Sequence, residues 1–159
     1  MRRRALPVPD RVAATVLVAV RLLRKSSRPP TYATDGASGL DLVADLASPL
    51  VLAPLERALV QTGIELEIPL GYEGQIRARS GRALREGLAL VNAPGTVDSD
   101  YRGEIHVLLI NLGQAPISIR PGDRIAQLVL APVVRAELVE KDVLRTSVRG
   151  AGGFGHTGL

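Results

Sequence analysis

Short runs of aliphatic and β-branched residues, each closed by a turn, constrain the fold of this 159-residue chain more than any other feature. Turn segments such as Pro69–Gly71, Ala93–Gly95 and Pro121–Asp123 separate these runs. The expected strands are Val16–Leu23, Leu40–Val43, Ala58–Ile68, Tyr72–Ala78, Glu104–Asn111, Ile117–Ile119 and Ile125–Val134. One short helical stretch is expected near Arg82–Arg85, because no longer segment spaces its apolar residues with a helical period. The pattern predicts an all-β domain, compact and barrel-like or sandwich-like, with one short helix.

The two ends of the chain differ in composition from its middle. Residues Met1–Arg11 form a basic segment before the first expected strand, and we interpret them as a mobile N-terminal extension. The β domain is expected over residues 12–148. The last residues, 149–159, read RGAGGFGHTGL, and so many glycines predict a flexible C-terminal segment without regular structure.

An apolar run after the basic start, Val12–Val20, superficially resembles a secretion signal. Arg21 and Arg24 follow it closely, and no small-residue cleavage pattern is present. The run is also too short to cross a bilayer. We therefore expect a cytoplasmic protein that does not associate with membranes.

The residue types present limit the chemistry. With no cysteine and only two histidines, cysteine nucleophiles, thiolate zinc sites and histidine metal cages are excluded. A metal would be held by carboxylates, water or substrate, which favours a hard ion such as Mg²⁺ and points to phosphate chemistry. The net charge of +4 suits an anionic ligand, but Lys and Arg are scattered along the chain, so no specific nucleic-acid binding is expected.

A Pro-Gly turn followed by acidic residues, NAPGTVDSDYRG over 92–103, is the first candidate for catalysis. We expect an extended strand that places Asp98 and Asp100 on one face, because alternate residues of a strand project the same way. Asp98 could then activate a water for attack on phosphorus. The same residues are compatible with a hairpin that carries solvated acids, and Tyr101 with ordinary packing.

Three other segments carry charged or hydroxyl groups within or next to the expected strands and helix. Arg79 and Ser80 lie where a strand ends and the helix begins, a position that favours anions. Alternatively, Ser80 only caps the helix and Arg79 pairs with a carboxylate. Asp41 interrupts an apolar strand, so it should pair with an arginine or lie near a metal. The turn PGDRIAQ, 121–127, is the kind that most often has only a structural role.

The glycine-rich C-terminal segment has two interpretations. Composition alone favours a disordered terminus. However, glycines let backbone N–H groups approach phosphates, and Arg149, His156 and Thr157 offer further donors. Phe154 has no core to join in such a segment but could stack on a base, which makes the segment a candidate lid.

Taken in order, the segments ASGLDLVAD, ARSG, NAPGTVDSDYRGEI, PGDRIAQL and RGAGGFGHTG resemble the five ordered motifs of the trimeric dUTPases, and the resemblance covers residues 16–159. Their shared order and spacing argue against coincidence. The resemblance implies hydrolysis of dUTP to dUMP and pyrophosphate, which keeps uracil out of DNA and supplies dUMP for thymidylate synthesis. It also implies a barrel-like β-clip fold, a requirement for Mg²⁺, and a homotrimer in which three chains share each site.

The same resemblance assigns roles to individual residues. Asp98 is implied as the general base, Tyr101 as the wall that leaves no room for a ribose 2′-hydroxyl, and Asp41 as a Mg²⁺ ligand through water. Backbone groups of residues 96–98 would distinguish uracil from cytosine. Nucleotide contacts are implied for Arg79, Ser80, Gly81, Asn92, Thr96, Val97, His106, Gln127, Arg149, Phe154, Gly155, His156 and Thr157.

Two alternatives share part of this pattern. A dCTP deaminase-like enzyme has a similar fold and an Arg-Ser motif, but the HxTA-like run with a catalytic Glu is absent here. A non-catalytic regulator that binds dUTP would not need the acid at position 98, and Asp98 therefore argues against it.

Overall fold

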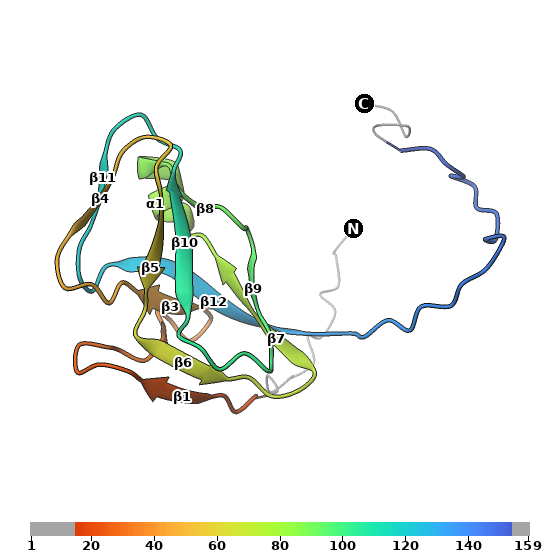
Figure 1. Cartoon of the computed structure of the whole chain (residues 1–159), viewed down its shortest axis with the longest axis horizontal. Coiled ribbons are helices and arrows are strands. Elements are labelled where there is room, and N and C mark those ends of the chain that lie inside the picture. Colours follow the sequence, from red (N-terminus) through yellow and green to blue (C-terminus); the bar gives the residue numbers. More distant parts are fainter. Residues whose placement is uncertain (1–14, 154–159) are drawn as a thin grey trace, which may run out of the picture.

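The computed structural model describes residues 15–153, which form a small β domain followed by an extended C-terminal arm (Figure 1). In chain order the elements are β1 (Ala19–Leu22), β2 (Thr31–Tyr32), β3 (Leu40–Val43), β4 (Leu50–Leu52), β5 (Arg57–Gln61), β6 (Ile64–Glu67), β7 (Tyr72–Arg77), α1 (Ser80–Glu86), β8 (Leu88–Leu90), β9 (Gly95–Val97), β10 (His106–Asn111), β11 (Ile117–Ile119) and β12 (Arg124–Pro132). The expectation of an all-β fold with one short helix is confirmed.

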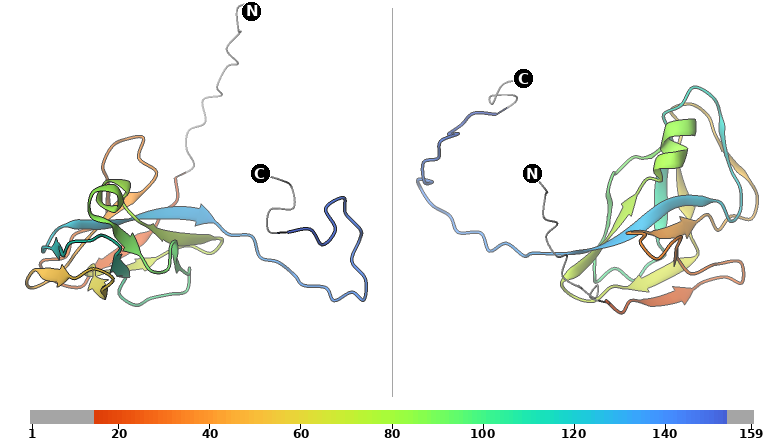
Figure 2. Two further views of the ribbon diagram at one scale, coloured as in Figure 1. Left: turned by 90° about the horizontal axis from the view of Figure 1, so that it is seen from above. Right: turned by 180° about the vertical axis from the view of Figure 1, so that it is seen from behind.

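The strands pair into four small sheets that enclose one core (Figure 2). The largest sheet has the order β2-β3-β12-β7-β9, with β12 antiparallel to both β3 and β7. The other sheets have the orders β5-β10-β8, β1-β6 and β11-β4. Strand β9 is thus one of the two edge strands of the largest sheet, and its free edge can bind other groups through its backbone.

Aliphatic side chains fill the core, as expected for a chain in which only 3% of residues are aromatic. Leu52, Val60, Val107 and Ile119 are fully buried. Burying each such side chain contributes roughly 1.5–3 kcal/mol. Along β10 more buried and less buried residues alternate, as they do on a strand with one face toward the core.

The single strand expected over residues 58–68 is wrong, because the chain turns at Thr62 and Gly63 and forms β5 and β6 instead. Gly63 has a φ of +73°, a conformation that glycine adopts without strain. The buried Thr62 hydroxyl donates a hydrogen bond to the Ile105 carbonyl at 2.5 Å. Because apolar residues lie on both sides of this turn, the sequence reads as one continuous strand.

The first strand is shorter than expected, because only Ala19–Leu22 pair with β6. An extended strand leading to Asp98 was expected where β9 lies. Three strands were not expected at all, namely β2, β4 and β8. Each has two or three residues, which is too few to establish a period of two. Partners from distant parts of the sequence stabilise them, as β10 does for β8.

In the part of the chain that the structure describes, the last element is β12, which ends at Pro132. The boundary of the β domain at residue 148 stays a prediction. Residues 133–153, which we call the C-terminal arm, run away from the β domain (Figures 1 and 2). Nearly all of them are exposed, including Val134 at 93% and Leu138 at 92%. The arm therefore adds little to the core of its own chain.

Within residues 15–153, no helix has both the length and the apolar character needed to span a bilayer.

Candidate active site

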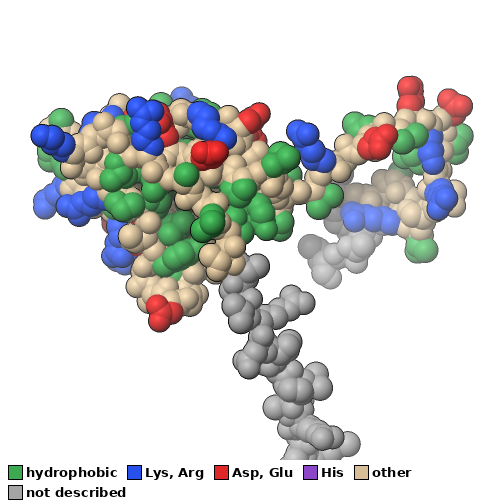
Figure 3. All heavy atoms as spheres, turned by 90° about the horizontal axis from the view of Figure 1, so that it is seen from below, with side chains coloured by type: hydrophobic (Ala, Val, Ile, Leu, Met, Phe, Trp, Pro, Cys, Tyr) green, Lys and Arg blue, Asp and Glu red, His purple; other side chains and the backbone are tan. Residues whose placement is uncertain are grey.

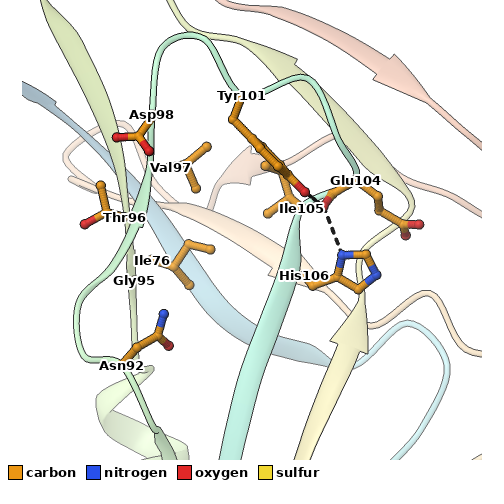
Figure 4. A pocket seen from close by; sticks show the side chains of 10 residues that line it. All are labelled: Ile76, Asn92, Gly95, Thr96, Val97, Asp98, Tyr101, Glu104, Ile105 and His106. Carbon is orange, nitrogen blue, oxygen red and sulfur yellow. Dashed lines mark hydrogen bonds between the residues drawn. The ribbon is translucent and has the colours of Figure 1, made fainter.

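A pocket opens where β9 and the loop after it face the beginning of β10 (Figure 4). Its cavity volume is about 200 Å³. The lining residues are Ile76, Asn92, Gly95, Thr96, Val97, Asp98, Tyr101, Glu104, Ile105 and His106. Pockets for small ligands usually have volumes of roughly 300–1,000 Å³, so this one accommodates only part of a larger ligand.

Strand β9 contributes backbone as well as side chains to the pocket. It pairs with β7 on one side only, with Gly95 opposite Ile76 and Val97 opposite Gly74. Its other edge has no strand partner among residues 15–153. Backbone N–H and C=O groups on such an edge can bind a ligand. A ligand that carries both donors and acceptors could therefore pair with that edge.

Asp98 lies directly after β9, at the rim of the pocket. The expectation that Asp98 and Asp100 share one face of a strand is wrong, because the strand ends at Val97 and a turn follows. The turn is closed by the Tyr101 N–H, which donates to the Asp98 carbonyl at 3.2 Å. No hydrogen bond or ion pair within residues 15–153 engages the exposed Asp98 carboxylate. That carboxylate is thus available to accept a proton.

Tyr101 and His106 are fixed by one backbone carbonyl, that of Glu104 (Figure 4). The Tyr101 hydroxyl donates to it at 3.0 Å, and Nδ1 of His106 lies 2.9 Å from it. Because a carbonyl only accepts, Nδ1 of His106 must carry the proton. The Tyr101 ring lies over Gly103, where an added Cβ would be 2.5 Å from the hydroxyl oxygen. A larger residue than glycine at position 103 would displace the ring.

Sequence reasoning did not identify Glu104, Ile76, Ile105 and Gly95 as pocket residues. The sequence could have indicated Glu104, because it lies two residues before His106 at the start of an apolar run. Burial opposes ionisation of Glu104, but hydrogen bonds from Arg24 and from the Gly63 N–H, with the charge of Arg24, hold its pKa below the usual range. Glu104 is therefore ionised at neutral pH and paired with Arg24.

A second group of the predicted residues lies outside this pocket, around the beginning of α1. Asp41 on β3 is buried and pairs with two arginines, Nε of Arg79 at 2.9 Å and Nη1 of Arg124 at 3.0 Å. The pairing with an arginine, one of the two alternatives for Asp41, is therefore observed. Its water-mediated contact with a metal stays a prediction.

Arg79 occupies the N-cap position of α1 and makes no side-chain capping hydrogen bond. Ser80 is the first helical residue and so is not the cap. Nearby, Nε2 of Gln127 donates to the Ala78 carbonyl at 3.1 Å, which anchors the end of β7. Gly81 follows Ser80 in the helix. Arginine and hydroxyl groups thus lie together at this corner.

The C-terminal candidates lie elsewhere again. Arg149 is exposed on the arm, and its Nε donates to the Gly152 carbonyl at 2.7 Å. Phe154, Gly155, His156 and Thr157 fall outside the described residues. None of residues 133–153 lines the pocket. The structure of one chain therefore brings together Asn92, Thr96, Val97, Asp98, Tyr101 and His106, and separates them from Arg79, Ser80, Gly81, Gln127 and Arg149.

One pocket holds an edge strand, a carboxylate and a tyrosine, and a separate cluster of arginines lies at the beginning of α1. These features define the class of this protein, an all-β domain with a candidate site for a small anionic ligand. The dUTPase family model matches residues 25–158. The chain belongs to the dUTPase family.

Two relatives show how far the likeness extends. A deoxyuridine 5′-triphosphate nucleotidohydrolase of Anaeromyxobacter sp. is 59% identical over 146 residues, which cover 90% of this chain and 98% of that protein. An enzyme of the same name from Methylocella silvestris is 60% identical over 131 residues, covering 81% of this chain and 82% of that protein.

Solved structures agree with this assignment. The Staphylococcus bacteriophage 80alpha dUTPase with dUpNHpp has a TM-score of 0.83 at 28% identity, covering 91% of this chain and all of that one. A mutant dUTPase from phage phi11 of S. aureus, described with a structural Mg(II) ion, has a TM-score of 0.73 at 26% identity. It covers 80% of this chain and 97% of that one.

Proposed function

We propose that this protein hydrolyses dUTP to dUMP and pyrophosphate with Mg²⁺, as a homotrimer whose active sites are shared between subunits. This proposal rests on the pocket beside the edge strand β9, which brings together Asn92, Asp98 and Tyr101. Relatives at about 60% identity are named for the same activity. We further propose that the protein is cytoplasmic, because its proposed substrate is a deoxynucleotide of that compartment.

Asp98 is the general base of the proposed reaction. Its carboxylate accepts a proton from a water, which attacks phosphorus so that the bond between the α-phosphate and the β-phosphate breaks. The oxygen of the water stays on dUMP, and pyrophosphate leaves. The exposed carboxylate supports this role, because no arginine among residues 15–153 competes for its lone pairs.

The pocket would hold the nucleoside part of dUTP. The free edge of β9 supplies backbone donors and acceptors for uracil, and Asn92, Thr96 and Val97 line the same wall. A fixed backbone pattern rejects cytosine, because the buried polar groups would be left without partners. Tyr101 and His106 close the opposite side, where the sugar would lie.

The triphosphate would extend beyond this small pocket to cationic groups of other subunits. Arg79, Ser80 and Gly81, with Gln127 behind them, provide one phosphate site, and Arg149 and Phe154–Thr157 of the C-terminal segment provide a lid. Exposed apolar side chains such as Leu55, at 73%, support subunit contacts. Figure 3 shows a face with hydrophobic side chains in its middle and Lys and Arg side chains toward its edges.

The residues present fit an ion that is held mainly by the substrate. Within the described part of the chain, no cluster of three or more His, Cys, Asp or Glu residues could form a protein cage for a metal. The two oxygens of Asp41 each accept from one arginine and keep lone pairs for a metal-bound water. Mg²⁺ usually keeps several waters and binds substrate phosphates, where it offsets their negative charge.

Pyrophosphate release tests the proposal. With Mg²⁺ present, we expect turnover of dUTP and little turnover of dCTP, dTTP or UTP, and chelation of the ion with EDTA should abolish it. Release of ammonia from dCTP would identify a deaminase. Tight binding of dUTP without any turnover would identify a regulator. Either result would overturn the proposed function.

Replacing Tyr101 with alanine should lower the preference for dUTP over UTP, measured as the ratio of kcat/KM values, by roughly 10- to 100-fold. The reason is steric, because the ring leaves no room for a 2′-hydroxyl. Tyr101→Phe is the matched control: it retains the ring and loses only the hydrogen bond to the Glu104 carbonyl, so it should lower the preference less than Tyr101→Ala does. An unchanged ratio in Tyr101→Ala would rule out the steric role.

A further inference from the structure

A charged network behind the pocket joins the segment after β1 to Glu104. The Arg24 guanidinium lies between two carboxylates. Its Nε donates to Oδ2 of Asp45 at 2.8 Å, and its Nη1 donates to Oε2 of Glu104 at 3.3 Å, with Nη2 contacting Oε1 of the same carboxylate. One planar cation thus holds two acids in fixed directions.

Both carboxylates have further partners that restrict their movement. The Ser27 hydroxyl donates to Asp45 at 2.7 Å, and the Gly63 N–H donates to Glu104 at 2.8 Å. Gly63 also packs closely against this network, because an added Cβ would come within 2.1 Å of Asp45 and Ser27 oxygens. The network is therefore held against the corner between β5 and β6.

The groups of the network are ionised at neutral pH. Hydrogen bonds to Glu104 and then to Asp45 raise the pKa of Arg24. Burial opposes ionisation of Asp45, but hydrogen bonds from Ser26 and Ser27 and the Arg24 charge hold its pKa below the usual range. The pKa of Glu104 is lowered by the same arginine, as described for the pocket wall.

Glu104 connects this network to the pocket. Its side chain is fixed by Arg24 and Gly63, and its backbone carbonyl binds both the Tyr101 hydroxyl and Nδ1 of His106. We propose that Arg24 is a positioning residue for sugar discrimination, which acts through Glu104 to hold Tyr101 and His106 in place. This proposal rests on the proposed function, because it concerns how the same pocket excludes a ribose.

A surface ion pair elsewhere in the domain provides a matched control. Arg21 on β1 pairs with Glu65 on β6 at 3.1 Å, and the Arg21 side chain is 75% exposed. Neither residue lines the pocket. Exposed pairs of this kind contribute little to stability. Arg21→Met therefore removes an arginine from the same region without disturbing Glu104.

The test compares Arg24→Met with Arg21→Met in steady-state kinetics with dUTP and UTP and in thermal unfolding. We expect Arg24→Met to lower the ratio of kcat/KM for dUTP over UTP roughly 5- to 10-fold, the scale of one weakened neutral hydrogen bond such as that of the Tyr101 hydroxyl. Arg21→Met should leave this ratio unchanged. A purely structural role would lower kcat for both nucleotides equally and keep the ratio.

Two further variants make the result specific. Arg24→Lys keeps the charge but not the planar group that reaches two acids, so its ratio should fall between those of wild type and Arg24→Met. If Arg24→Met fails to fold, Arg24→Lys carries the test through the same ratio. In a Tyr101→Phe background the effect of Arg24→Met should shrink, because the hydroxyl that connects them is gone.

The two proposals fail in different ways. If the wild-type protein does not hydrolyse dUTP, the proposed function is wrong. If it does, and folded Arg24 variants keep the wild-type ratio, the proposed function stands and the role of Arg24 is overturned.

Discussion

Replacing Asp98 with asparagine is expected to lower kcat for dUTP about 100- to 10,000-fold, the usual contribution of a general base. The amide is nearly isosteric with the carboxylate, so the fold and nucleotide binding should be kept. It cannot accept a proton from the attacking water. Because the Asp98 side chain has no partner within residues 15–153, its replacement breaks no ion pair there.

Measurement of kcat, together with the dissociation constant for a non-hydrolysable dUTP analogue, checks this prediction. Asp100→Asn is the matched control, because Asp100 lies two residues further along the same turn and does not line the pocket. It should retain near-normal turnover. Near-normal kcat in Asp98→Asn would assign the base to another residue.

Deletion of residues 149–159 should leave a folded trimer that binds dUTP weakly and turns it over about 100-fold more slowly or worse. The described part of the deleted segment, residues 149–153, lies in the exposed arm and contributes no residue to the core. The stability of the domain should therefore change little. Ordering the segment over substrate has an entropic cost that only new contacts offset. Phe154 on uracil and Arg149 on the terminal phosphate are the contacts we nominate.

Steady-state kinetics combined with light scattering check this second prediction. Phe154→Ala should reproduce part of the loss in kcat, and Arg149→Ala a larger part if phosphate charge dominates. Full activity of the truncated protein would mean that the segment is an ordinary terminus. A monomeric truncated protein would mean that it holds the assembly together.

Several strands could be predicted from the sequence, because apolar residues recur at alternate positions between turn residues. β7 and β12 were expected to within two residues at either end, and β3 and β11 matched their observed bounds. β2, β4 and β8 could not be predicted, because their two or three residues show no alternation of apolar and polar side chains and they form only through pairing with distant segments. The composition of a short segment does not indicate which distant strand it will pair with.

Most pocket residues could also be predicted, because they lie within one continuous segment from Asn92 to His106. The connection between Arg24 and Glu104 could not, since 80 residues separate them and no periodicity links the two. The pairing of Asp41 with Arg79 and Arg124 was foreseen only as one of two alternatives. Ion pairs between residues that are far apart in the sequence depend on the topology of the fold, and a single sequence motif does not specify that topology.

The C-terminal arm leaves the β domain after Pro132, and none of its described residues reaches the pocket of its own chain. If each arm closes over a neighbour, base and lid of one site are encoded on different copies of the chain. In genetic terms, a tail-deleted allele and an Asp98→Asn allele would then complement each other. Mixed trimers would contain pockets in which an intact Asp98 is covered by an intact tail, so selection acts on the assembly rather than on the single chain.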